Sequence, residues 1–163
     1  NMVTAIFGET GASPGHVQAL VQNPQYSLSV LTALAMGLQR LPGVPGRDSV
    51  VVFAAAAETQ DEVNFVASAV NMLARYHEAV APLGRVSAPG PILGHSVAGT
   101  LVLPGPVDHV SWIAPLGLTA ARPDLQGPDK LVFLSGQMSP RAHKNLTSRG
   151  WRISETFTIG AER

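Results

Sequence analysis

The chain contains no cysteine, so disulfide bonds, thiolate catalysis and cysteine-ligated zinc sites are all excluded. Metal binding by histidine is not indicated either, because no two histidines have the i, i+4 spacing of a helical zinc site. The five histidines stand apart along the chain at His16, His77, His95, His109 and His143. The sequence therefore predicts no metal centre, and no motif in it calls for a cofactor.

Charge is also scarce. Charged residues make up 13% of the 163 positions, about half of the ~25% that is usual. The 11 basic residues balance 11 acidic ones, and no segment carries a run of one sign. Nucleic-acid binding depends on basic patches that neutralise phosphates, so we expect no nucleic-acid partner. A surface so poor in charge is built from uncharged polar residues or is covered by a protein partner or a second copy.

Long hydrophobic runs are missing as well. The longest is Val50–Ala57, whereas a bilayer-spanning helix needs about 20 apolar residues. We therefore expect no membrane span. The length of the chain is that of one domain, and we interpret residues 1–163 as a single folded unit.

Apolar and helical patterns alternate along the chain. Largely apolar segments at 3–7, 49–53 and 130–134, without polar alternation, are typical of strands buried on both faces, as in a parallel sheet. Helical patterns occupy 13–23, 25–41, 59–80 and 139–149, and an alternating strand begins at Trp151. This order predicts an α/β fold in three layers: a mostly parallel sheet of 4–5 strands with helices on both faces.

The segment 59–80 has the clearest helical pattern. Thr59 and Glu62 have the spacing of a capping box, in which the two side chains satisfy free N–H groups of the first turn. Two apolar stripes and one polar stripe follow, which predicts a helix packed deeply into the core. His77 continues an apolar stripe and is expected to be a structural histidine.

The segment 82–128 differs in composition from the rest, because it holds eight of the 13 prolines. It predicts a Pro/Gly-rich irregular or hairpin excursion from the sheet, with a strand within Ser96–Leu103.

Three junctions share one spacing, since Phe7, Phe53 and Phe133 are each followed six residues later by a hydroxyl residue that can cap a helix. If the three strands are parallel neighbours, the caps meet at the carboxyl edge of the sheet, where helix N-termini favour anions. This hypothesis predicts a non-catalytic domain that binds a small polar or anionic ligand. Its expected ligand-binding residues are Gly8, Thr10, Gly11, Ser13, Thr59, Ser135, Gly136 and Ser139.

A second hypothesis is a structural or protein-interaction domain of a larger assembly. The low charge and the apolar helix at Leu28–Leu38 favour it, because both are typical of a surface that a partner or a second copy covers.

A third hypothesis comes from Gly94-His95-Ser96-Val97-Ala98, which resembles the Gly-x-Ser-x-Gly nucleophile elbow of the α/β-hydrolases, with Ala98 in place of the second glycine. The resemblance implies a serine hydrolase whose triad follows the family's order of serine, acid and histidine. Ser96, either Asp124 or Asp129, and His143 are then the candidate catalytic residues.

Overall fold

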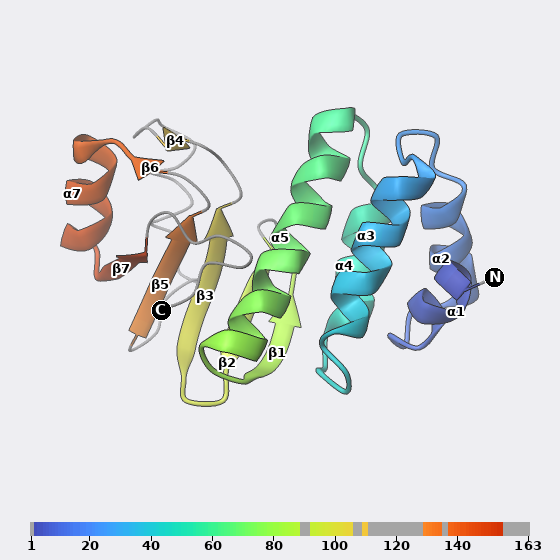
Figure 1. The fold of residues 1–163 in the computed structure, drawn as a ribbon, viewed down its shortest axis with the longest axis horizontal. Coiled ribbons are helices and arrows are strands. Elements are labelled where there is room, and N and C mark those ends of the chain that lie inside the picture. The colour runs from blue at the N-terminus through green and yellow to red at the C-terminus, as the bar shows by residue number, and fades with distance from the viewer. Residues whose placement is uncertain (1, 89–91, 106–108, 111–128, 135–136, 155–163) are drawn as a thin grey trace.

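The computed structural model describes residues 2–88, 92–105, 109–110, 129–134 and 137–154. Its first half is helical and its second half contains a sheet (Figure 1). The helical half consists of α1 (Met2–Gly8), α2 (Pro14–Val21), α3 (Leu28–Gln39), α4 (Arg47–Ala55) and α5 (Gln60–Ala79).

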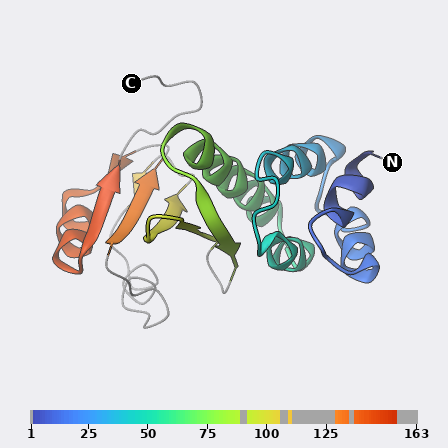
Figure 2. The same ribbon diagram turned by 90° about the horizontal axis from the view of Figure 1, so that it is seen from below.

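These five helices form two rows. In one row α1 contacts α3 and α3 contacts α5, while α2 contacts α4 in the other, so each helix packs against the one two places along the chain (Figure 2). Close approach makes this packing possible. A Cβ on Gly37 of α3 would stand 3.0 Å from side-chain atoms of both Val70 and Asn71 on α5.

The strands predicted at 3–7 and 49–53 are wrong, because both segments lie in helices, α1 and α4. A short continuous apolar run fits a buried helix as well as a buried strand. In α4, Val50, Val51 and Ala54 are buried whereas Val52 is 42% exposed, which is a helical spacing. Packing in the helical stack therefore outweighs the preference of β-branched residues for strands.

The main sheet has the order β1-β2-β3-β5-β7. Its β1–β2 and β2–β3 pairs are antiparallel, and its β3–β5 and β5–β7 pairs are parallel. The fold is mixed α/β, and the prediction of a mostly parallel sheet is wrong. The strands are β1 (Leu83–Ser87), β2 (Leu93–Ser96), β3 (Thr100–Gly105), β5 (Asp129–Leu134) and β7 (Trp151–Ser154).

Two short strands, β4 (His109–Val110) and β6 (Gln137–Met138), pair in parallel outside the main sheet. Helix α7 (Pro140–Ser148) follows β6 and packs against β7. Gly150 after α7 has φ +88°, the left-handed conformation that ends many helices.

The antiparallel part of the sheet arises where a single strand was predicted at 96–103. Ser96 ends β2 and Thr100 begins β3, and Gly99 between them has φ +102°. Glycine tolerates this conformation without steric cost, so the chain reverses there instead of running on. The excursion from the sheet predicted at 82–128 is wrong for much of its described part, because β1, β2 and β3 all belong to the main sheet. Residues 89–91, 106–108 and 111–128 lie outside the described residues.

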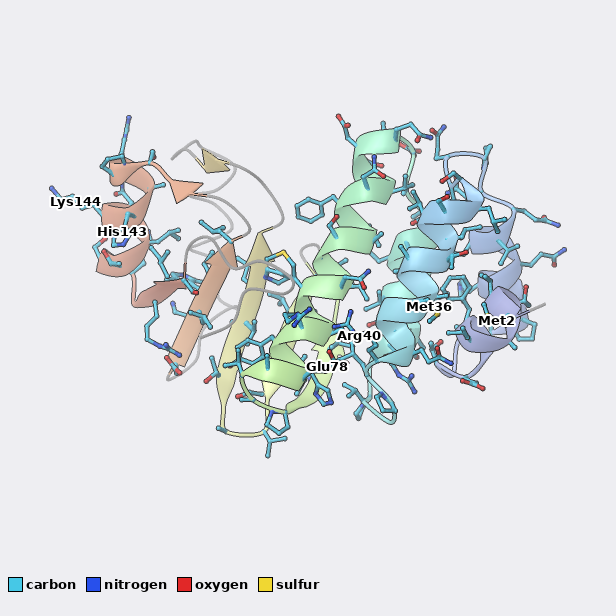
Figure 3. All side chains as sticks on the ribbon, viewed as in Figure 1. Met2, Met36, Arg40, Glu78, His143 and Lys144 are labelled. Atoms are coloured by element: carbon cyan, nitrogen blue, oxygen red, sulfur yellow. The ribbon has the colours of Figure 1, made fainter. Side chains whose placement is uncertain are left out.

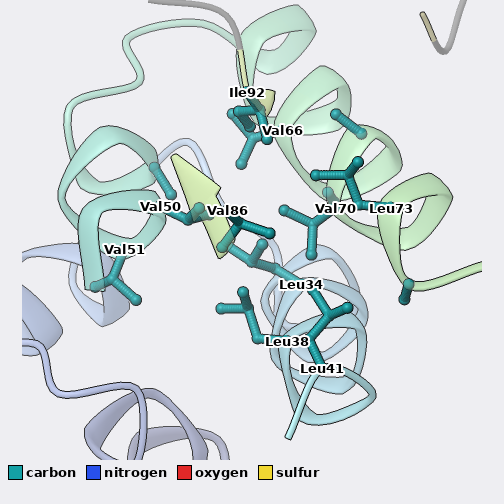
Figure 4. Packing of buried hydrophobic residues seen from close by; sticks show 14 of the residues in the cluster. Leu34, Leu38, Leu41, Val50, Val51, Val66, Val70, Leu73, Val86 and Ile92 are labelled. Atoms are coloured by element: carbon teal, nitrogen blue, oxygen red, sulfur yellow. The ribbon is translucent and has the colours of Figure 1, made fainter. Parts of the chain in front are cut away.

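The buried residues fall into two clusters, one on each face of the sheet. Val102 and Leu131 belong to the larger cluster, which the helical half completes, and their strand neighbours Leu101 and Val132 belong to the smaller one under α7. Since successive strand residues point to opposite faces, the helical stack and α7 cover opposite faces. Figure 4 shows the larger cluster, in which α3, α4 and α5 contribute Leu34, Leu38, Val50, Val66 and Val70 around Val86 and Ile92.

The helices predicted at 13–23, 25–41, 59–80 and 139–149 are confirmed as α2, α3, α5 and α7. His77 is structural, as expected, because its Nδ1 accepts the backbone N–H of Leu83 at 2.9 Å where β1 begins.

Candidate functional site

The crevice predicted from the three aromatic-to-cap spacings is not formed. Ser13, Thr59 and Ser139 do cap α2, α5 and α7, accepting backbone N–H groups from His16, Glu62 and Ala142. However, α2 and α7 lie at opposite ends of the molecule (Figure 1), and of the three caps Ser139 alone follows strands of a sheet. The shared spacing therefore reflects helix capping at three separate places and does not mark a common site.

Three of the other residues of the predicted crevice lie together beside Ser13, at the junction of α1 and α2. Gly8 ends α1, and Thr10 and Gly11 lie in the connection to α2. There the Thr10 hydroxyl donates to the carbonyl of Phe7 at 2.6 Å, and Gly11 has φ +93°. Ser135 and Gly136 lie outside the described residues.

The hydrolase arrangement is not supported by the geometry around Ser96. This side chain is buried, and its Oγ accepts the backbone N–H of Thr100 at 2.8 Å, which closes the β2–β3 hairpin rather than a strand-to-helix elbow. His143 is exposed on α7 (Figure 3), which packs on β7, with β3 and β5 between β7 and β2. Asp124 lies outside the described residues.

A cluster of polar side chains near the amino-terminal ends of β3 and β5 has a structural role. Arg152 donates to both carboxylate oxygens of Asp129, at 2.7 and 2.9 Å, and the Thr100 hydroxyl donates at 2.8 Å. The hydrogen bond from Arg152, followed by that from Thr100, lowers the pKa of Asp129. These hydrogen bonds of the carboxylate link β3, β5 and β7.

A more open feature lies between the end of α4 and the start of α5. We call it the α4–α5 groove; its volume is about 470 Å³. Its lining is largely apolar with carboxylates at the rim: Phe53, Ala56, Ala57, Glu58, Asp61, Glu62, Phe65 and Val66.

Asn23 and Tyr26 hold the α4 wall of the groove in place. The Asn23 amide donates to the carbonyls of Ala55 and Ala57, at 3.1 and 2.9 Å. The Tyr26 hydroxyl donates to the carbonyl of Ala54 at 2.8 Å, and burial raises the pKa of this phenol, so it remains a donor. The end of α4 is therefore fixed to the α2–α3 connection.

The α5 wall is fixed by its capping interactions. The Glu62 N–H donates to the Thr59 hydroxyl at 3.1 Å, as the capping box predicts. The Glu62 carboxylate accepts from the N–H of Glu58 at 2.6 Å, one residue before the cap, instead of from Thr59 itself. This contact orients one of the rim carboxylates.

The groove exposes apolar area that the fold itself does not cover. Val66 is buried and Phe53 is half-buried, but Phe65 stays 41% exposed. Leaving an aromatic side chain in water sacrifices about 25 cal/mol for each Å² that burial would remove from solvent. A partner that covered Phe65 would recover that free energy.

The rim of the groove is negative. Glu58, Asp61 and Glu62 line it, no Lys or Arg does, and none of the three forms an ion pair with another described residue. Carboxylates near a helix N-terminus interact favourably with its dipole, which explains their tolerance at the start of α5. Their negative charge is also available to attract a cationic ligand.

Among the residues that the structure describes, no group of three or more His, Asp or Glu side chains could hold a metal ion. None of the described helices combines the length and the hydropathy that crossing a bilayer requires. Comparison of the chain with protein-family models, with curated proteins and with solved structures finds no match.

Sequence reasoning missed the groove because it interpreted 49–53 as a strand. Two signals could have indicated it. The alanines that follow Phe53 have small side chains, so they leave room beside the following helix. Phe65 has four polar neighbours on the α5 helix: Asp61 and Glu62 on the preceding turn, Asn64 directly before it and Ser68 on the following turn.

Proposed function

We propose that this protein is a protein-interaction domain whose α4–α5 groove binds an amphipathic helical segment bearing Lys or Arg beside its apolar face. The observation that carries the proposal is the combination of an apolar lining, with Phe65 exposed, and three rim carboxylates without a cationic partner among the described residues. Grooves of this composition bind amphipathic helices through spaced apolar anchors.

The architecture supports this function. Stacked helix rows present long grooves and are widely used as binding surfaces. The sheet, as the middle of three layers between the helical stack and α7, is then a scaffold that fixes the stack from one end. Charge at the rim favours one orientation of the partner and speeds its association, since complementary charge acts mainly on specificity and on-rate.

Selection from a phage-displayed library of random peptides tests the proposal. We expect enriched peptides to combine apolar residues at helical spacing with Lys or Arg. Synthetic copies of them should bind the protein in fluorescence anisotropy, more weakly as salt is raised, because screening reduces the attraction of exposed charges.

Matched variants localise the binding. Phe65→Ser should abolish most of the affinity, whereas Met36→Ser on α3, whose side chain is 42% exposed and lies outside the groove (Figure 3), should not change it. Removing two rim charges together, Glu58→Gln with Asp61→Asn, should reduce both the affinity and its salt dependence. Glu9→Gln, an exposed acid beyond the groove, is the control for charge. Selection of acidic peptides, or equal binding by Phe65→Ser and the wild type, would contradict the proposal.

A further inference from the structure

A second pocket lies on the β1–β2 hairpin, and we call it the hairpin pocket. Its volume is about 560 Å³, and its lining includes Ser49 of α4, Arg85, Ser87 and Ala88 of the first strand and its end, and Leu93 and His95 of β2. It is a separate site from the α4–α5 groove, because Ser49 lies in the first turn of α4 and the groove uses the last residues of that helix.

Strand register places three polar side chains together in this pocket. Arg85 pairs with His95 and Ser87 pairs with Leu93 in the antiparallel β1–β2 ladder. Residues that pair directly, or that lie two positions apart on a strand, share one face of a sheet. Arg85, Ser87 and His95 therefore line the same face, and the Ser87 Oγ lies 3.2 Å from the His95 Nε2.

The charge of the pocket is positive. Of the described residues that line it, Arg85 alone is charged. It is exposed, and its guanidinium makes no hydrogen bond or ion pair with any residue that the structure describes. Asp48 follows Arg47 in the first turn of α4, but its exposed side chain is not part of the lining. Burial, and then the charge of Arg85, lower the pKa of His95, which favours the neutral imidazole, so the positive charge of the pocket is that of Arg85.

The hydrogen-bond donors in the hairpin pocket suit an oxyanion. One proton is shared in the hydrogen bond between the Ser87 Oγ and the His95 Nε2. When Nε2 carries that proton and donates it to Ser87, the Ser87 hydroxyl can donate its own proton to a ligand. Ser49 is not such a donor, because its hydroxyl donates to the Gly46 carbonyl at 2.6 Å. The guanidinium fork of Arg85 binds two oxygens of one anion, and a third oxygen remains for the hydroxyl on a tetrahedral oxyanion such as a phosphate, but not on a carboxylate, which has two.

We infer that the hairpin pocket binds a phosphate monoester, with the phosphate on Arg85 and Ser87 and its organic group against Leu93 and Ala88. The pocket is larger than a phosphate ion alone needs, and Leu93 and Ala88 supply an apolar wall for the rest of the molecule. His95 orients the Ser87 hydroxyl and is a positioning residue.

Titration with phenyl phosphate, followed by the imidazole signals of His95 in NMR and by calorimetry, tests the inference; inorganic phosphate and benzoate are the comparison ligands. We expect a saturable shift with phenyl phosphate, weaker binding of inorganic phosphate because it lacks the apolar group, and no binding of benzoate at the same concentrations. Arg85→Gln should weaken phenyl phosphate binding about tenfold or more, and Ser87→Ala to a smaller extent.

Arg141→Gln is the matched control, since Arg141 is an exposed arginine on α7 outside the pocket, and it should leave binding unchanged. The absence of a saturable His95 shift, equal binding of benzoate, or unchanged binding by Arg85→Gln would each overturn the inference. None of these results bears on the α4–α5 groove, which is tested with peptides and with Phe65→Ser.

Discussion

Arg40 at the end of α3 and Glu78 near the end of α5 form a two-point ion pair (Figure 3). The Nε–Oε2 distance is 3.1 Å and the Nη2–Oε1 distance is 2.6 Å. The same arginine donates to the Asn71 side chain at 3.3 Å, and Asn71 in turn donates to the carbonyl of Ala33 in α3. This network links the two helices that make the most extensive contact in the stack, beside the close approach at Gly37.

The ion pair makes part of the stability pH-dependent. The hydrogen bond from Arg40 is the main cause that lowers the pKa of Glu78. A carboxyl group with a lowered folded-state pKa stabilises the fold above its unfolded pKa and loses that contribution as the pH falls through the folded value. The Glu78 side chain is 45% exposed, so we expect Glu78→Gln to cost only about 0.5 kcal/mol near neutral pH. In urea unfolding, the difference from wild type should shrink as the pH falls below about 4.3, the ordinary pKa of glutamate, and vanish below the lowered folded-state pKa; a difference that grows on acidification would contradict this.

Gly46 is the position where the chain has least room for a side chain. Its φ is +94°, and a Cβ there would lie 1.7 Å from the carbonyl oxygen of Val86 on β1. We expect Gly46→Ala to cost at least about 2 kcal/mol, because left-handed strain and a backbone clash act together. Gly43→Ala is the control: φ is +73° but no atom lies within 4 Å, so strain alone should cost about 1 kcal/mol. Equal losses in urea unfolding would show that β1 does not pack on Gly46.

Thr59 stabilises α5 through its cap. Thr59→Ala leaves the Glu62 N–H without its side-chain acceptor, and caps of this kind contribute about 1 kcal/mol. We expect the melting temperature to fall by about 2–4 °C in a chain of this length. Thr59→Ser retains the hydroxyl and should melt close to the wild type. A loss as large in Thr59→Ser would point to the methyl group rather than the cap.

Ser96 stabilises the β2–β3 hairpin. In Ser96→Ala the N–H of Thr100 loses its 2.8 Å acceptor in a buried position, at a cost of about 1–3 kcal/mol. Hydrogen exchange at the Thr100 amide should accelerate while amides of α2 keep their protection. Hydrolysis of p-nitrophenyl acetate should be the same in both proteins; a loss of turnover confined to Ser96→Ala would restore the hydrolase hypothesis.

Patterns that depend on neighbours along the chain predicted structure well. The capping residues Ser13, Thr59 and Ser139 each accept the expected N–H, and the helices behind them form. The strand predicted at 130–134 is also found, as β5. The capped helices follow from hydrogen bonds and periodicity within a few residues, whereas the strand shares its pattern with 3–7 and 49–53, which are helical, and depends on its packing.

Contacts between distant segments decided the rest. The apolar runs at 3–7 and 49–53 become α1 and α4 because helices that are far apart in sequence, α3 with α1 and α2 with α4, offer helical surfaces to pack on. The α4–α5 groove depends on Asn23 and Tyr26, which bond to carbonyls about 30 residues away. The hairpin pocket depends on a strand register that sets Arg85 beside His95.

The sequence by itself determined where the capped helices α2, α5 and α7 begin, that cysteine chemistry is absent, and that charge is sparse, since each of these is a property of residue type and local spacing. The tertiary structure alone decided whether an apolar run became a helix or a strand, which carboxylates and aromatics share a groove, and which polar side chains share a face. Burial stabilises an apolar run in either conformation, and only the surface against which it packs selects between them.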